Sequence, residues 1–260
     1  MKLAFSTLGC PDLSLAEIID LARGARYDGV ELRAVDGTID LGSVADLAPD
    51  RAAATAERFA QAGLEVACLD SSVRVDGPLD RSTRDEARRS LDLAARVRAP
   101  YVRVFAGRPR PGAEAITTGV AELAHLAAAA GVRVAVETHG EMSRSRDLMD
   151  ALDGVSEQVG VVWDVMHTFR AGEGIAQSLA LVLPRLVHVH LRDAATAGAG
   201  HDFVRTGEGI MPIAQVVEAL QAAGYSGYLS FEWEKFWHPD LEEGATVIPH
   251  FADHLRSVMA

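Results

Sequence analysis

Leu186-VHVHL-Arg192 is a short apolar run rich in β-branched residues, with a helix-like segment further on. Three other runs in the second half of the chain share this character: Arg133-VAVE-Thr138, Val159-GVVWD-Val165 and Tyr228-LSFE-Trp233. Runs of this length and composition are typical of buried parallel strands that lead into crossover helices. The second half therefore predicts four parallel strands.

The first half supplies four more strand-like runs, at residues 2–9, 29–33, 64–71 and 100–107. Between the runs lie stretches with apolar residues spaced three and four apart, which predict helices over residues 15–26, 51–63 and 84–98. Gly63, Gly131 and Gly224 follow helix-like segments, where helices commonly end. Eight alternations of strand and helix in 260 residues predict a single (β/α)₈ TIM barrel, with residues 1–260 as one domain.

Composition limits the classes of binding partner and the cellular compartment that we expect. With 25 basic and 37 acidic residues the net charge is −12, so the overall field would repel a phosphate backbone, and we expect no nucleic-acid partner. Cys10 and Cys68 form no disulfide framework and are expected to be free thiols that pack in the core. The sequence shows neither a signal segment nor a membrane span, which predicts a cytoplasmic protein with no membrane partner.

Four metal-type ligands stand at corresponding positions near the ends of the second-half strands: Glu137, Asp164, His190 and Glu232. The carboxyl ends of the strands in such a barrel converge on one face. Three carboxylates and one imidazole gathered there would repel one another unless a cation lay between them. The set therefore predicts one divalent metal ion, Mn²⁺ first, with Mg²⁺, Co²⁺ or Zn²⁺ as alternatives.

At these residues the chain resembles the xylose isomerase-like TIM-barrel superfamily and, within it, the sugar-phosphate isomerases and epimerases. The resemblance covers essentially the whole chain and is most specific at the following motifs: Glu137-Thr138-His139, Asp164-x-x-His167, His188-x-His190 with Asp193, Gly207-Glu208-Gly209, and Glu232. It implies that Glu137, Asp164, His190 and Glu232 hold the metal. It also implies that Glu137 and Glu232 act as the acid/base pair and that His167 contacts substrate oxygens.

Several other polar residues could contribute to the site. His139, His167, Arg192, Arg205 and Lys235 are candidates for orienting hydroxyl, carboxylate or phosphate groups of a substrate. His188 lies on the same side of its strand as His190, so it is either a second ligand or a hydrogen-bonded neighbour of one. Asp193 either anchors the following loop or orients a neighbour. Glu31 and Arg103 could line the pocket, or they could form ion pairs inside the barrel.

The leading functional hypothesis is a metal-dependent isomerase or epimerase of a small sugar or other polyhydroxylated carbonyl compound. It would remove a proton beside a carbonyl and form an enediolate that the metal stabilises. A dehydratase of the dehydroshikimate or inosose type starts in the same way and stays open as an alternative. A non-catalytic barrel that binds sugar or metal is a second alternative. An endonuclease IV-like repair enzyme is disfavoured, because the early strands lack histidine. The oligomeric state is open, with a homodimer or homotetramer as candidates.

Overall fold

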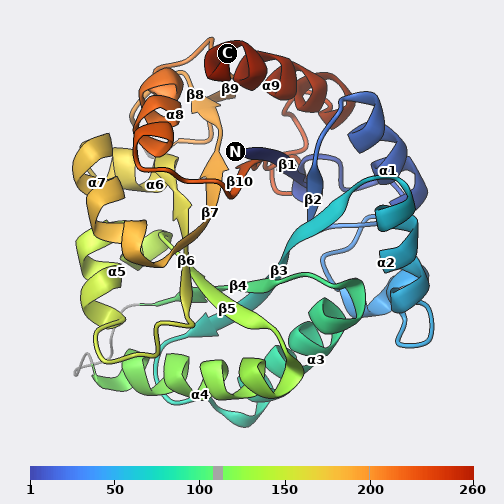
Figure 1. The fold of residues 1–260 in the computed structure, drawn as a ribbon, viewed down its shortest axis with the longest axis vertical. Helices are drawn as coiled ribbons and strands as arrows, with labels where there is room; N and C mark the ends of the chain where they lie inside the picture. The colour runs from blue at the N-terminus through green and yellow to red at the C-terminus, as the bar shows by residue number, and fades with distance from the viewer. Residues whose placement is uncertain (108–113, 199) are drawn as a thin grey trace.

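Eight parallel strands close into a barrel in the computed structural model, in the order β1-β10-β7-β6-β5-β4-β3-β2. Residues 1–107, 114–198 and 200–260 are described. Figure 1 shows the ring of strands surrounded by helices. The barrel strands have these bounds: β1 Lys2–Ser6, β2 Gly29–Leu32, β3 Glu65–Val75, β4 Tyr101–Ala106, β5 Arg133–Glu137, β6 Gly160–Asp164, β7 Leu186–Leu191 and β10 Tyr228–Phe231. The predicted (β/α)₈ barrel is confirmed.

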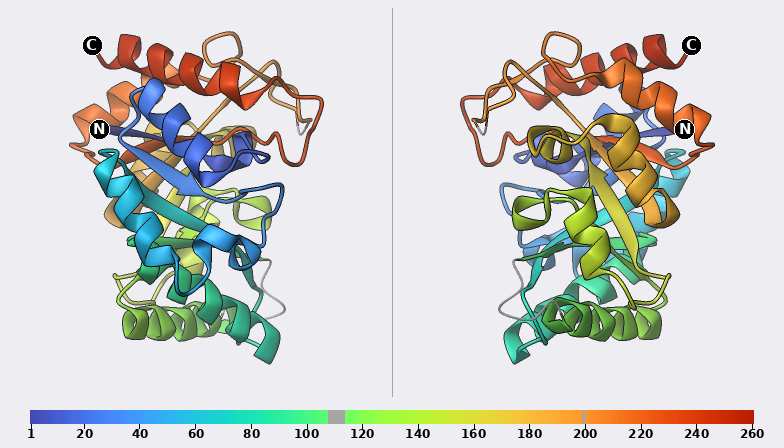
Figure 2. Two further views of the ribbon diagram at one scale, coloured as in Figure 1. Left: turned by 90° about the vertical axis from the view of Figure 1, so that its right-hand side faces the viewer. Right: turned by 90° about the vertical axis from the view of Figure 1, so that its left-hand side faces the viewer.

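The helices form an outer layer, as the two side views also show (Figure 2). Their bounds are α1 Leu15–Gly24, α2 Ala52–Gln61, α3 Arg81–Val97, α4 Glu114–Ala130, α5 Ser145–Ala151, α6 Val165–Arg170, α7 Ile175–Val182, α8 Ile213–Ala222 and α9 Gly244–Met259. Short 3₁₀ turns occupy η1 Thr7–Gly9, η2 Leu41–Ser43, η3 Ala45–Leu47, η4 Gly140–Met142 and η5 Leu183–Arg185. Among the described residues, no helix is long and apolar enough to span a bilayer.

Element boundaries follow local capping chemistry. Gly63, Gly131 and Gly224 have φ values of +74°, +72° and +70°, the left-handed conformation that ends a helix at little cost for glycine. The helix predicted from residue 84 begins earlier, at Arg81, because the Asp80 side chain accepts a hydrogen bond from the Thr83 N–H and caps it. β3 extends beyond the prediction, to Val75.

Alternation along β7 divides its side chains between two environments. Val189 and Leu191 belong to the apolar core that includes the inner faces of the helices. His188 and His190 lie on the other side, inside the barrel, where both contact Glu31 of β2. Residue pairs such as Asp164 and His190 are direct neighbours in the sheet, so the register brings polar side chains of adjacent strands to one level.

The connection from β7 to α8 is long and includes a small antiparallel ladder, β8 Asp193–Ala194 with β9 Phe203–Val204. The Asp193 carboxylate accepts hydrogen bonds from the backbone N–H groups of Gly207, Gly209 and Met211 at 2.9–3.0 Å. Asp193 therefore anchors this loop, the first of its two predicted roles. Figure 2 shows the loop and the segment after β10 projecting on the same side of the molecule. Cys10 and Cys68 are buried free thiols, as expected.

Candidate metal centre

The four predicted ligands meet at one end of the barrel. Glu137 and Asp164 are the last residues of β5 and β6, His190 lies near the end of β7, and Glu232 directly follows β10. One ligand atom from each lies within 4.8 Å of the others, and all four residues are buried. The His190 Nδ1 atom is 3.5 Å from Glu232 Oε1 and 3.7 Å from Glu137 Oε1. These are separations that a single ion between the atoms could close to coordination bonds.

The His190 ring is held by a carboxylate on the opposite side of the barrel. Its Nε2 atom lies 3.0 Å from Glu31 Oε2, and the same oxygen lies 2.5 Å from His188 Nε2. With Nε2–H donating to Glu31, the Nδ1 lone pair points at Glu137 and Glu232. Nδ1 is buried and has no hydrogen-bond partner among the described residues. A histidine ligand whose second nitrogen donates to a carboxylate is the usual arrangement at protein metal sites.

Two buried guanidinium groups connect the ligands to further carboxylates. Arg103 of β4 lies between Asp70 and Glu137, with its Nη2 3.2 Å from Asp70 Oδ2 and its Nε 3.1 Å from Glu137 Oε2. Arg192 donates to Asp164 Oδ2 at 2.8 Å and is also paired with Glu232. These arginines fix the carboxylates in place but compensate only part of their charge.

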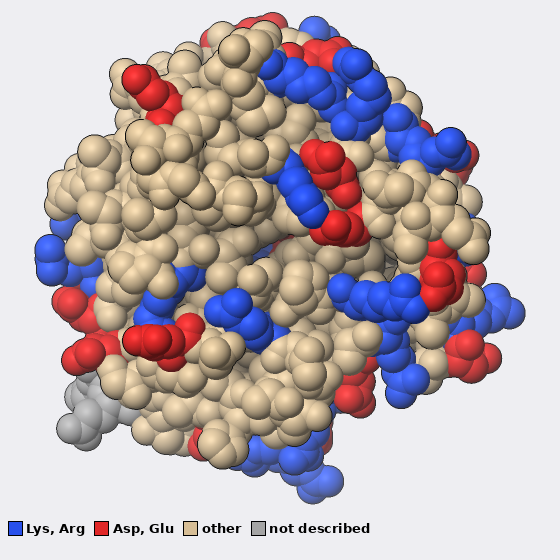
Figure 3. Space-filling model, in the orientation of Figure 1, with Lys and Arg blue, Asp and Glu red and all other residues tan. Residues whose placement is uncertain are grey.

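The charge balance inside the barrel fits a divalent cation. Five buried carboxyl groups face three buried guanidiniums, so the fully ionised set leaves two negative charges when the histidines are neutral. The residues concerned are Glu31, Asp70, Glu137, Asp164 and Glu232 against Arg33, Arg103 and Arg192. Burial raises the pKa of Asp70 well above its usual value, so a proton on Asp70 takes up part of that charge when no cation is bound. Uncompensated charge is costly in a medium of low polarity, so a dication would remove a large penalty. The outer surface contrasts with this interior, since Figure 3 shows acidic and basic side chains interspersed over the face viewed.

The ionisation of the ligands follows from their neighbours. Burial acts to raise the pKa of Glu137, but Arg103 and His190 outweigh it and lower that pKa to about 2. Glu232 shows the same opposition, and its pKa is lowered by His190 and Arg192. Burial acts to lower the pKa of His190, but Glu31 and Glu232 raise it well above its usual value. Both carboxylates are therefore anionic, and in the metal-free protein a proton on His190 supplies part of the missing positive charge.

Two of the predicted substrate-contacting histidines lie beside the ligands. The rings of His139 and His167 pack edge to face with centroids 4.5 Å apart. His167 Nε2 lies 3.3 Å from Arg192 Nη2 and 3.8 Å from Asp164 Oδ2. Burial is the main cause that lowers the pKa of His167, which keeps this ring neutral near pH 7. The structure thus brings His139, His167 and Arg192 together next to the ligands.

Arg205 and Lys235 are placed differently. Arg205 is half-buried, with 40% of its side chain exposed, and forms an ion pair with Glu242. The Lys235 ammonium group donates to the carbonyl oxygens of Pro239 and Leu241 and to Glu243, at 2.6–2.7 Å. Among the described residues, neither side chain contacts the four predicted metal ligands. Their roles as substrate contacts stay predictions.

Sequence reasoning missed several residues that the structure places at the site. Glu234 pairs with Arg192 at 3.2 Å, and burial is the main cause that raises its pKa to about 7. It also forms a second potential ligand group with His201 and His238, whose rings stack with centroids 3.9 Å apart. Its position two residues after Glu232 was the available signal, because period-two spacing places such residues on one face.

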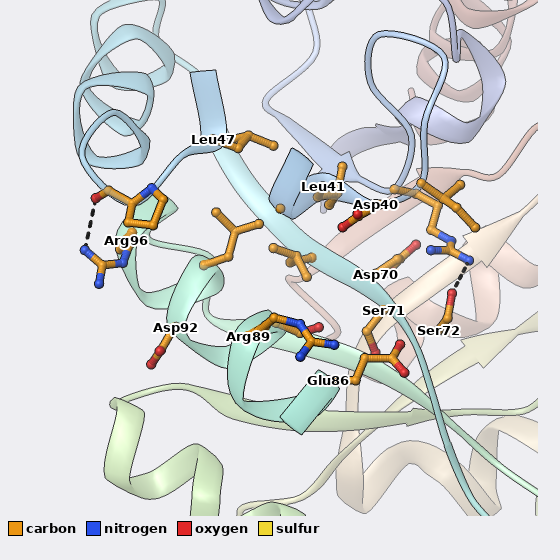
Figure 4. A pocket seen from close by; sticks show the side chains of 17 residues that line it. Asp40, Leu41, Leu47, Asp70, Ser71, Ser72, Glu86, Arg89, Asp92 and Arg96 are labelled. Carbon is orange, nitrogen blue, oxygen red and sulfur yellow. Dashed lines mark hydrogen bonds between the residues drawn. The ribbon is translucent and has the colours of Figure 1, made fainter. Parts of the chain in front are cut away.

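A cavity of about 660 Å³ opens next to the barrel, between α3 and the connection from β2 to α2. Figure 4 shows Glu86, Arg89 and Asp92 along α3 on one side and Leu41 and Leu47 on the other. Arg33 and Asp70 belong to this lining and also to the charged interior of the barrel. The cavity therefore adjoins the ligand group through these two residues.

Comparison with known proteins gives consistent results. The model of the family described as "Xylose isomerase-like TIM barrel" matches residues 19–257. The probable 3-DHS dehydratase AsbF from Bacillus anthracis superposes with a TM-score of 0.81 at 18% identity, covering 98% of this chain and 99% of that one. The IolI protein with a bound zinc atom has a TM-score of 0.79 at 19% identity, with 100% and 98% coverage. D-psicose 3-epimerase from Clostridium cellulolyticum H10 has a TM-score of 0.78 at 16% identity, with 100% and 99% coverage.

One curated protein, the uncharacterized protein YihM of Escherichia coli (strain K12), is 22% identical over 219 residues. The match covers 80% of this chain and 63% of YihM.

Proposed function

Because the chain belongs to the xylose isomerase-like TIM-barrel family, we propose that it is a divalent-metal-dependent isomerase or epimerase of a small sugar or other polyhydroxylated carbonyl compound. The observation that carries this proposal is that ligand atoms of Glu137, Asp164, His190 and Glu232 lie within 4.8 Å of one another, while Nδ1 of His190 has no hydrogen-bond partner among the described residues. A donor set of carboxylates with one imidazole accommodates Mn²⁺, which we take as the first ion to test, with Mg²⁺, Co²⁺ and Zn²⁺ as alternatives.

The residues that surround the ligands determine what chemistry is possible. A bound divalent ion would polarise a carbonyl group and so acidify the neighbouring C–H bond. Glu137 and Glu232 both adjoin His190 Nδ1, at 3.7 and 3.5 Å. We assign one of them to accept the proton from that carbon and the other to return a proton to the resulting enediolate. Their cationic neighbours favour the anionic form of both carboxyl groups, as the proton acceptor requires, so the one that acts as donor first takes up a proton from solvent.

His139, His167 and Arg192 are assigned to substrate orientation. The Nε–H group of Arg192 is buried without a hydrogen-bond partner among the described residues, and a neutral His167 can donate to or accept from a hydroxyl group. The buried position of Arg192 excludes water from its hydrogen bonds, which makes them stronger. Holding the reacting carbon within reach of a fixed base accounts for a large part of the rate in such reactions.

A dehydratase shares the first step and differs in the second. After proton removal it would expel a β-hydroxyl group as water, with an acid to protonate the leaving oxygen. The fold similarity to the probable 3-DHS dehydratase AsbF keeps this reaction as the alternative. The product formed, rather than the exchange of the proton, separates the two reactions.

The test is deuterium incorporation from D₂O into a panel of ketoses, aldoses, inososes and hydroxy-keto acids, followed by NMR and mass spectrometry. We expect Mn²⁺-dependent exchange at the carbon beside the carbonyl, and its loss in Glu137→Gln. Glu218→Gln, an exposed carboxylate on α8, is the matched control and should leave exchange unchanged. A product of unchanged mass identifies an isomerase or epimerase, whereas loss of water identifies a dehydratase. Tight stoichiometric metal binding without exchange on any compound would contradict the proposal and favour a binding role.

A further inference from the structure

Three guanidinium groups are buried at this end of the barrel, and one of them differs from the others. Arg103 and Arg192 each pair with two or more carboxylates. Arg33 is also buried, with 5% of its surface exposed, but no carboxylate lies within ion-pair distance of it among the residues that the structure describes. Within the same residues, its side chain makes one hydrogen bond, from Nη2 to Ser72 Oγ at 2.9 Å.

A buried guanidinium without an anionic partner is energetically unfavourable. Its five N–H donors form a planar fork that matches the two oxygens of a carboxylate or phosphate. Buried charges in folded proteins are normally paired, because desolvation is otherwise uncompensated. Retaining such a group therefore suggests that its partner arrives with a ligand.

The Arg33 backbone is anchored, so its side chain starts from a fixed point. The N–H groups of Arg33 and Ala34 both donate to Thr7 Oγ1, at 2.8 and 3.0 Å. Arg33 directly follows β2, the strand that carries Glu31. A binding group fixed in this way loses little conformational entropy when a ligand binds.

The location of Arg33 connects it with both the ligand group and an open volume. Arg33 lines the cavity of about 660 Å³ together with Ser71 and Ser72. Figure 4 labels these two serines. Burial and the charge of Arg103 lower the pKa of Arg33 to about 10, while Asp70, Glu232 and Glu137 act in the opposite direction, so Arg33 lies within electrostatic range of these carboxyl groups without an ion-pair contact to any of them. A small molecule could therefore have its carbonyl end at the metal ligands and its anionic end on Arg33, at the edge of this cavity.

We propose that Arg33 binds an anionic group of the substrate, so that the substrates are polyhydroxylated carbonyl compounds carrying a carboxylate or a phosphate. This inference rests on the proposed function and narrows its substrate class. Arg33 acts as a binding and specificity residue and takes no part in proton transfer.

The first experiment compares Arg33→Gln with the wild type in the deuterium-exchange assay. Three groups of compounds are used: hydroxy-keto acids, phosphorylated ketoses and neutral ketoses. We expect the wild type to prefer one of the two anionic groups, which identifies the carboxylate or the phosphate as the ligand chemistry. Loss of one charge-assisted pair should raise KM for that group roughly 10- to 100-fold, with a smaller change in kcat. KM for neutral ketoses should stay the same.

Arg96→Gln is the matched control, because Arg96 lines the same cavity but is exposed and, among the described residues, its side chain donates only to the Pro49 carbonyl oxygen. It should behave as the wild type. If neutral ketoses are the best substrates and Arg33→Gln leaves every KM unchanged, the inference is overturned while the proposed function stands.

A second pair of measurements does not depend on turnover. Calorimetry with malonate and with inorganic phosphate should show binding of one of them to the Mn²⁺-loaded wild type, and this binding should be lost in Arg33→Gln but kept in Arg96→Gln. The Tm of Arg33→Gln should equal or exceed that of the wild type, since the substitution removes an unpaired buried charge. A large fall in Tm would show that Arg33 is structural, and equal anion affinity in both proteins would refute the binding role.

Discussion

The two halves of the barrel contribute different kinds of residue to the same site. The second half carries the four potential ligands, on or directly after β5, β6, β7 and β10. In the first half, Glu31 on β2 contacts His190, and Arg103 on β4 pairs with Glu137 and with Asp70 on β3. Glu31 and Asp70 also form a potential ligand group with His190 and Glu232. The predicted ligands therefore come from the second half, and the closed sheet brings the charged groups of the first half into contact with them.

This division has a physical basis in charge. Four ligands alone would be a cluster of three anions and one imidazole, which could not be buried without cations nearby. Arg103 from the first half and Arg192 from the second reduce that charge, and Glu31 orients the one neutral ligand. We therefore expect substitutions in the second half to abolish metal binding and chemistry, and substitutions in the first half to change stability and affinity.

The largest effect should follow removal of the metal. We expect chelation to suppress exchange more than Glu137→Gln does, because one proton carrier contributes roughly 10²–10⁴-fold whereas electrostatic stabilisation is usually the larger contribution. The measurement is the exchange rate of chelated, Mn²⁺-restored and Glu137→Gln protein on one substrate. Exchange that survives complete metal removal would refute metal dependence.

Arg103→Gln should affect folding more than any other single change in the first half. It would leave Asp70 and Glu137 buried without their shared cation, which typically costs about 3–5 kcal/mol of unfolding free energy. Urea unfolding of the metal-free protein measures this loss. Arg98→Gln is the control, since Arg98 pairs with Glu57 at the exposed surface and should change stability by less than about 1 kcal/mol. Equal losses for the two variants would contradict the neutralising role of Arg103.

Glu31→Gln should weaken metal binding without removing a ligand. Loss of the carboxylate that fixes His190 typically costs 10- to 100-fold in metal affinity at such sites. Competition with a fluorescent chelator gives the affinity. Glu65→Gln, at the exposed start of the neighbouring β3, should bind metal like the wild type. An unchanged affinity in Glu31→Gln would mean that the ring is oriented by packing alone.

The sequence predicted the second half of the site better than the first. Glu137, Asp164, His190 and Glu232 follow similar apolar runs, so a single pattern indicates that they converge. Glu31 could be singled out, but its partner could not, because His190 lies 159 residues away and the contact depends on closure of the sheet. The role proposed for Arg33 could not be predicted from the sequence for a related reason. It depends on Arg33 having no ion-pair partner among the described residues, and only the folded structure shows this.

Loop residues were predicted least well. Arg205 and Lys235 lie in sequence near the site motifs, but their charges are compensated by Glu242 and Glu243. Glu242 is 37 residues from Arg205, so this pairing of two connections depends on the fold. Asp193 was easier, because a short acidic side chain before a Gly-rich loop often binds its backbone N–H groups. Roles for the individual site residues, and the assignment of residues 1–260 to one domain, stay predictions.

The pH dependence of metal affinity should sharpen the comparison further and is the smallest effect we expect. In the metal-free protein Glu31 and Glu232 raise the pKa of His190 above its usual value, so a proton competes with the metal for Nδ1 at neutral pH. Metal affinity should then increase with pH, by up to about tenfold per unit for one displaced proton, and level off above the raised pKa.

Removing the first-half carboxylate in Glu31→Gln lowers the pKa of His190, so the affinity curve should level off at a lower pH. Isothermal titration between pH 6 and pH 9, in buffers of different ionisation enthalpy, counts the protons released. If the two proteins share one pH profile, Glu31 does not control the protonation of His190, and the two halves of the barrel act independently.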